Sequence, residues 1–155
     1  MPKRSAGILL HRSGPDGPEV LLVHPGGPFW AKRDAGAWSI PKGEIDPGEE
    51  PRAAALREFA EELGTAAPDG ELIELGEIRQ AGGKTVVAFA LAGDLDVSAI
   101  RSNMIAIVWP PRSGRSIDVP EIDRAAWFSL AQARTRILAA QAPLLDRLAT
   151  ALGRM

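Results

Sequence analysis

The chain of 155 residues contains no cysteine, and this absence excludes several kinds of chemistry. Without thiols the protein cannot form disulfides, use a thiolate nucleophile or hold zinc through cysteine ligands. Its two histidines, His11 and His24, each end an apolar segment and lack the spacing of metal ligands, so structural or solvated roles are expected for both. Any catalytic centre must therefore be built from other side chains.

The sequence also lacks an excess of positive charge and any long apolar run. Its 18 lysines and arginines are outnumbered by 20 aspartates and glutamates, so the formal net charge of −2 gives no sign of a nucleic-acid partner. The longest apolar runs, such as residues 86–92, are too short to cross a bilayer, and the N-terminal segment lacks a complete signal-peptide core. We therefore expect a cytoplasmic protein that does not associate with membranes.

Length and composition indicate a single globular domain over residues 1–155. The chain is 45% hydrophobic and 25% charged, as soluble globular proteins are, and it has no internal repeat, low-complexity tract or long linker. These features leave open whether the protein is a monomer or a homodimer.

Alternating and β-branched segments predict strands at residues 6–11, 19–24, 38–41, 71–80, 84–91 and 105–109. A helix over about residues 50–63 is marked by Pro51, which suits a first turn, and by Gly64, which suits the position just past the C-terminus. Its expected apolar face holds Leu56, Phe59 and Leu63, with the acidic residues on the opposite side.

Two further helices are expected near the C-terminus. Ser129 and Gln132 have the form of a capping box that opens a helix over residues 130–139, and another helix at about 144–152 follows Pro143. Mixed strands around one central helix, with helices at the end, predict an α+β fold of the α/β/α sandwich type.

Residues 43–64, GEIDPGEEPRAAALREFAEELG, carry charges at a distinctive spacing. On a helix, Glu58, Glu61 and Glu62 stand at i, i+3 and i+4, so their carboxylates crowd one face. Like charges at this spacing destabilise an isolated helix by a few tenths of a kcal/mol per pair. A hard divalent cation with oxygen ligands would offset that repulsion, so this segment is the expected functional centre.

The segment resembles the Nudix box, written G-x5-E-x7-R-E-U-x-E-E-x-G-U, in which U is a bulky aliphatic residue. All seven fixed positions are filled, by Gly43, Glu49, Arg57, Glu58, Glu61, Glu62 and Gly64. Phe59 occupies the first U position and Thr65 the last, a departure that concerns packing rather than ligands. Seven chance identities would be rarer than about one in ten million, so the motif is specific.

The resemblance implies a Nudix fold, in which the box forms a loop–helix–loop motif on a mixed sheet between helices. It also implies a hydrolase that uses Mg²⁺ or Mn²⁺ to cleave nucleoside diphosphates linked to another group. The metal ligands implied by position are the Gly43 carbonyl, Glu58, Glu61 and Glu62. Arg57 and Glu49 would pair to hold the loop against the helix. Either Glu58 or Glu61 would serve as general base, and the sequence leaves that choice open.

Charged residues outside the box also resemble functional residues of this family. Lys42 lies in WSIPKG, which is similar to the segment before the box in diadenosine tetraphosphate hydrolases, where it would reach a phosphate rather than only face water. Lys84 resembles a phosphate-binding lysine of the same hydrolases, or protects an edge strand. Glu121, with Asp123 as the alternate, resembles the acidic residue that completes the metal site, although a carboxylate on a loop is often simply solvated.

Aromatic residues in the Gly/Pro-rich loop at 25–36 permit two interpretations. Phe29 and Trp30, near Arg33, could stack on a nucleobase beside phosphate-binding cations, or they could anchor the loop on the core. Trp127 is expected in the core, and the basic loop PPRSGR at 110–115 is expected to face water.

These observations predict a metal-dependent Nudix hydrolase acting on a small nucleotide, with a dinucleoside tetraphosphate such as diadenosine tetraphosphate as the preferred substrate. The first alternative is a house-cleaning nucleoside triphosphate pyrophosphatase of MutT type. A catalytically silent nucleotide-binding regulator is a different class, and the complete set of box carboxylates counts against it. Decapping of RNA 5′ ends is disfavoured because the chain lacks a strong basic surface.

Overall fold

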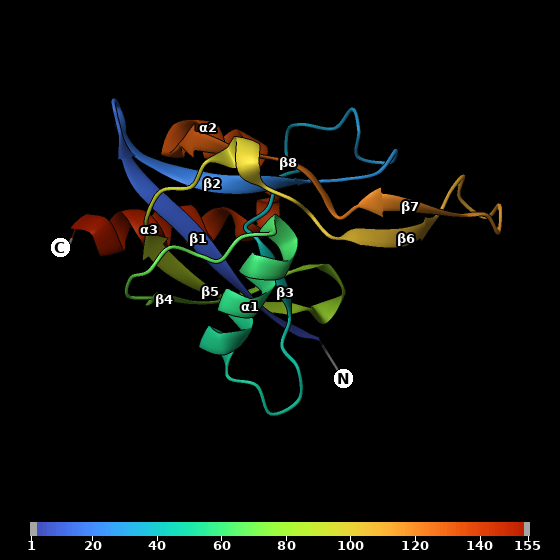
Figure 1. Cartoon of the computed structure of the whole chain (residues 1–155). Helices are drawn as coiled ribbons and strands as arrows, with labels where there is room; N and C mark the ends of the chain where they lie inside the picture. The colour runs from blue at the N-terminus through green and yellow to red at the C-terminus, as the bar shows by residue number, and fades with distance from the viewer. Residues whose placement is uncertain (1–2, 154–155) are drawn as a thin grey trace.

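A six-stranded mixed β-sheet lies at the centre of the computed structural model, which describes residues 3–153 (Figure 1). Its strands are β1 (Arg4–Gly14), β2 (Gly17–Pro25), β3 (Lys42–Glu44), β4 (Ile73–Arg79), β5 (Thr85–Ala92) and β8 (Ile122–Ser129). The order is β4-β5-β1-β2-β8, with β3 paired to β1. β1 and β5 are parallel, and the other pairs are antiparallel.

The two faces of this sheet bury separate apolar clusters because successive side chains of a strand point to opposite faces. In β1, Ile8 and Leu10 belong to the cluster beneath the central helix, whereas Leu9 belongs to the cluster on the other face. Neighbouring strands are buried in the same way, so the middle strands read as almost continuous apolar runs.

Helices cover both faces and complete the sandwich. α1 (Pro51–Leu63) contributes Phe59 and Leu63 to one cluster, while α2 (Leu130–Arg136) and α3 (Ala142–Gly153) cover the other (Figure 1). This arrangement confirms the predicted α+β fold with a mixed sheet between helices. The expected end of α1 is also present, since Gly64 adopts a left-handed conformation with φ 71° and donates its N–H to Ala60.

A separate hairpin projects from the sandwich (Figure 1). Its strands, β6 (Met104–Val108) and β7 (Ser116–Pro120), pair only with each other within the described residues. The predicted capping box at Ser129 and Gln132 is confirmed at the start of α2. None of the helices within residues 3–153 has both the length and the hydropathy of a membrane-crossing segment.

Several predicted elements differ from the observed ones. The strand expected at residues 38–41 is replaced by β3 at 42–44, and Trp38 and Ser39 form only isolated bridges. Strands β7 and β8 occupy residues for which no element was predicted, because charged and proline residues interrupt the alternation there. The helix expected over 130–139 ends at Arg136. Leu56 is 42% exposed instead of packed, since α1 approaches the sheet through the small residues Ala54 and Ala55.

Candidate active site

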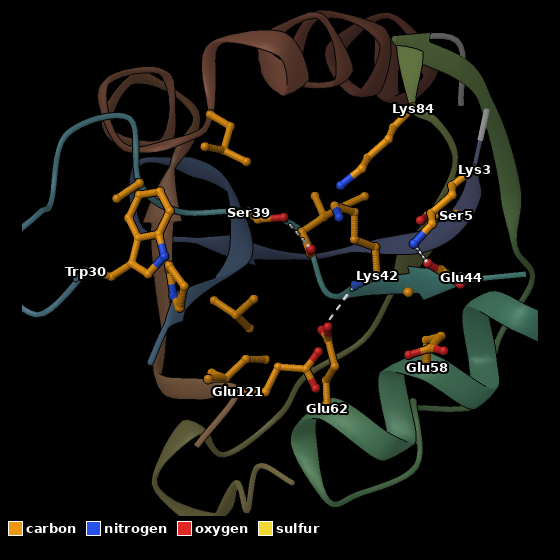
Figure 2. A pocket seen from close by; sticks show the side chains of 17 residues that line it. Lys3, Ser5, Trp30, Ser39, Lys42, Glu44, Glu58, Glu62, Lys84 and Glu121 are labelled. Atoms are coloured by element: carbon orange, nitrogen blue, oxygen red, sulfur yellow. Dashed lines mark hydrogen bonds and ion pairs between the residues drawn. The ribbon is translucent and has the colours of Figure 1, made fainter. Parts of the chain in front are cut away.

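A cavity of about 490 Å³ lies between α1, β3 and the ends of β2 and β8 (Figure 2). Charged side chains from distant parts of the chain surround it. The carboxylates are Glu44, Glu58, Glu62 and Glu121, and the lysines are Lys3, Lys42 and Lys84. Glu58 and Glu62 come from α1, and the Lys84 side chain points inward from the opposite side (Figure 2).

Arg57 and Glu49 form the pair that the box predicts. Arg57 donates from Nε to Glu49 Oε2 at 2.8 Å and from Nη2 to Glu49 Oε1 at 2.9 Å, which is a bidentate bond. The same guanidinium donates to the carbonyl of Glu44 at 2.9 Å, so it joins α1 to the end of β3. Hydrogen bonds from Arg57, and one from the backbone of Asp46, lower the pKa of Glu49 to about 2.

Glu58 lies directly against Gly43, which explains why this position is glycine. A Cβ on residue 43 would overlap the carboxyl group of Glu58. Glu58 also accepts a hydrogen bond from Arg57 Nη1 at 2.8 Å. Burial raises the pKa of Glu58 above its ordinary value, while the neighbouring Arg57 acts in the opposite direction.

Glu62 is the most deeply buried carboxylate of the site, with only 7% of its surface exposed. Its hydrogen-bond donor is the neutral backbone N–H of Lys42, at 3.1 Å, rather than a charged side chain. Burial raises the pKa of Glu62 to about 8, and the negative charges of Glu121 and Glu58 add to this effect. The site therefore holds an acid that is costly to ionise unless a positive charge lies nearby.

The remaining predicted acids separate into two groups. Glu121 lines the cavity with Glu58 and Glu62. Glu61 is exposed and does not line the cavity, and its carboxylate accepts a hydrogen bond from Arg57 at 3.2 Å. Asp123, the alternate to Glu121, is instead bonded at 2.9 Å to His24, whose ring is fully buried and also bonds the carbonyl of Arg33 at 2.5 Å. His24 thus has the structural role expected for it.

No group of three or more acidic or histidine side chains within residues 3–153 is already gathered at metal-ligand distances. Two of these carboxylates have protein donors instead, because Arg57 donates to Glu58 and the Lys42 backbone N–H donates to Glu62. The donor set nevertheless fits a hard divalent cation, since it consists of carboxylate and carbonyl oxygens. The glycine at position 43 lets the Glu58 carboxyl group lie against the backbone that carries the Gly43 carbonyl, and Glu62 has a negative charge that only a neutral N–H compensates by hydrogen bonding.

Both lysines singled out in the sequence, Lys42 and Lys84, line the cavity. Lys3 lies there as well, with its Nζ 3.1 Å from Glu44 Oε1, and no sequence motif marks Lys3 or Glu44 as a site residue. Strand pairing brings Lys3 close to Lys84, because the Lys3 carbonyl accepts the N–H of Thr85, the residue after Lys84, at 3.0 Å. Trp30 also lines the cavity, whereas Trp127 packs elsewhere, with Arg12 over its ring at 4.0 Å.

Comparison with known proteins places these features in a family. A model of the Nudix domain matches residues 1–148. Over 64 residues the chain is 42% identical to a Mycobacterium tuberculosis protein provisionally named 8-oxo-dGTP diphosphatase 3, covering 41% of this chain and 28% of that protein. Over 41 residues it is 46% identical to the RNA pyrophosphohydrolase of Erythrobacter litoralis, covering 26% and 25%. The matched region thus spans about a quarter of the length of these curated relatives.

Similarity of fold extends further than similarity of sequence. The structure of the Ap4A hydrolase of C. elegans superposes with a TM-score of 0.65 and 22% identity, covering 97% of this chain and 99% of that one. At this identity the likeness concerns the fold alone. The domain match over almost the whole chain, together with the complete box, shows that the protein belongs to the Nudix family.

Proposed function

We propose that the protein acts as one domain that hydrolyses a phosphoanhydride bond of a nucleoside polyphosphate, with Mg²⁺ or Mn²⁺ as cofactor. The observation that carries this proposal is the cavity in which Glu58, Glu62 and Glu121 face Lys42 and Lys84. Acidic residues on one side suit a divalent cation, and lysines on the other suit phosphate oxygens. When bound, the cation would neutralise phosphate charge and lower the pKa of a water that attacks phosphorus.

The residues of the chain take distinct roles in this proposal. Glu58, Glu62 and Glu121, with the carbonyl of Gly43, hold the cation, and Arg57 acts as a positioning residue that orients Glu58 through their 2.8 Å bond. Glu58 lines the cavity and Glu61 does not, which favours Glu58 as general base.

The preferred substrate is a dinucleoside tetraphosphate such as diadenosine tetraphosphate. Three lysines in one cavity, Lys3, Lys42 and Lys84, supply enough positive charge for a chain of several phosphates. The resemblance of WSIPKG and Lys84 to diadenosine tetraphosphate hydrolases points the same way. The alternative is a nucleoside triphosphate pyrophosphatase of MutT type, which the local identity to the M. tuberculosis protein favours.

A substrate panel tests the proposal. Diadenosine tetraphosphate, ordinary nucleoside triphosphates and oxidised ones would be incubated with Mg²⁺, Mn²⁺ or EDTA, and the products separated by chromatography. We expect turnover that requires the cation and is reduced by orders of magnitude in Glu58→Gln and Glu62→Gln. Glu74→Gln is the matched control, because Glu74 is exposed and lies outside the cavity. Nucleotide binding without turnover of any substrate would instead support the silent regulator.

A further inference from the structure

The β6–β7 hairpin exposes more apolar surface than a two-stranded sheet can bury by itself. Met104 is 59% exposed, Val108 53%, Ile105 38% and Ile117 36%. An isolated hairpin is only marginally stable in water, so its position depends on what it packs against. The chain is tied to the body just after the hairpin, where the carbonyl of Glu121 accepts the N–H of Gly26 at 3.0 Å.

An apolar cleft separates this hairpin from the loop after β2. Its volume is about 460 Å³, and its walls come from two segments far apart in sequence. Phe29 and Trp30 form one wall, and Ile105, Ile107, Val108 and Trp109 form the other. Gly27 lies between the walls at one end, with a φ of 95° that favours glycine.

The cleft adjoins the charged cavity of the proposed active site. Pro25, Trp30 and Glu121 line both spaces. Trp30 and Glu121 lie on the side of the charged cavity that is away from Lys3 and Lys84 (Figure 2). A ligand with its phosphates between the lysines and the acids would therefore extend its remaining part towards the aromatic cleft.

We propose that this cleft binds the base of the nucleoside polyphosphate by stacking against its aromatic walls. The proposal rests on the proposed function, because the polyphosphate in the charged cavity delivers the base. Contacts within the loop hold the aromatic wall in place: Phe29 and Trp30 meet edge to face at 4.9 Å, and the Arg33 guanidinium covers one face of the Phe29 ring at 4.3 Å. Stacking on aromatic side chains accepts any base, so the site gives affinity for nucleosides in general.

Matched probes separate the base from the phosphates. The α,β-methylene analogue of ADP and methylenediphosphonate share a phosphate part that water cannot cleave, and only the first carries a nucleoside. Titration calorimetry with Mg²⁺ would compare both probes on the wild type, Trp109→Ala and Trp109→Phe. We expect Trp109→Ala to weaken binding of the nucleotide analogue at least about fivefold, to leave methylenediphosphonate unchanged, and to be largely rescued by Trp109→Phe.

Ile117→Ala is the matched control, because Ile117 belongs to the same hairpin, is exposed and does not line the cleft. It should leave binding of both probes unchanged. Equal loss in Ile117→Ala and Trp109→Ala, or unchanged affinity for the analogue in Trp109→Ala, would overturn the inference while the proposed function stands. Failure of both probes to bind the wild type would overturn both. The wild type could also dimerise, and Trp109→Ala could abolish the dimer without changing affinity for the analogue. That result would assign the cleft to a second copy of the chain and overturn the base-binding proposal.

Discussion

Replacing Glu62 by glutamine should change how the stability of the metal-free protein depends on pH. Burial raises the pKa of Glu62 to about 8 in the folded state from an ordinary value of 4.5. Between these values the folded protein keeps a proton that the unfolded chain releases. Stability linked to this group is therefore fully present below about pH 4.5 and is lost as pH rises towards about 8.

The size of the effect follows from the gap between the two pKa values. A difference of one pKa unit corresponds to about 1.36 kcal/mol, so the gap limits the loss of folding free energy to roughly 5 kcal/mol. Because relaxation and water entry reduce the cost of a buried charge, we expect a loss of roughly 2–5 kcal/mol by pH 9. Glutamine keeps an oxygen that can accept the Lys42 N–H but cannot ionise, so Glu62→Gln should escape this loss.

Urea unfolding in EDTA from pH 5 to pH 9 measures the difference directly. The free energy of unfolding of Glu62→Gln, relative to wild type, should increase with pH, since the titration of other groups cancels in the comparison. Glu74→Gln, at an exposed position, should follow the wild type at a constant offset. Parallel curves for Glu62→Gln and wild type would refute the assignment of Glu62 as a buried, poorly compensated acid.

Three further substitutions test the packing of the site and the fold. Gly43→Ala should lower turnover strongly while the far-ultraviolet circular dichroism is kept, because a Cβ displaces the Glu58 carboxyl; wild-type rates would contradict this. Phe59→Ala should cost about 3–5 kcal/mol in urea unfolding, since Phe59 is 0% exposed in the core. Ser129→Ala should cost about 1 kcal/mol through loss of the capping box, and an unchanged midpoint would argue against that cap.

The ends of α1 and the loop before it could be predicted because their determinants are local. Pro51 and Gly64 mark the helix in the sequence, and the conformations observed at both ends match. The Glu49–Arg57 pair spans only eight residues and belongs to a specific motif, so its hydrogen bonds were also foreseeable.

The burial of Glu62 was within reach of the sequence but was missed. Ala55, Phe59 and Glu62 stand at i, i+4 and i+7, so they share the face of α1 that packs on the sheet. Assigning the face by residue type instead of by spacing placed Leu56 inside and Glu62 outside. The geometry of the helix favours the opposite arrangement, because alanine allows the closest approach to the sheet.

The distinction between Glu121 and Asp123 could not have been predicted. Glu121 lies in the bend between β7 and β8, whereas Asp123 belongs to β8, so the alternation of a single strand does not relate their side chains. The register between β2 and β8 shifts at His24 and Pro25, opposite this segment, and an irregularity of this kind redirects the side chains beside it. Glu121 consequently lines the cavity while Asp123 bonds His24, an outcome set by pairing between strands about a hundred residues apart.

The burial that penalises Glu62 should also determine how strongly a cation stabilises the fold. An ion that binds only the folded state adds about 2.7 kcal/mol when its free concentration is a hundred times Kd. At pH 8 the same ion also relieves the cost of ionising Glu62, so Mg²⁺ should raise the Tm of the wild type clearly and that of Glu62→Gln much less. Near pH 5, where Glu62 is protonated, the wild type should lose most of this response, because a protonated carboxyl is a poor ligand. An equal rise in Tm for both proteins at pH 8 would place the cation elsewhere. The instability of the metal-free protein at high pH and its affinity for the ion would then be separate properties, and the cost of ionising Glu62 would not link them.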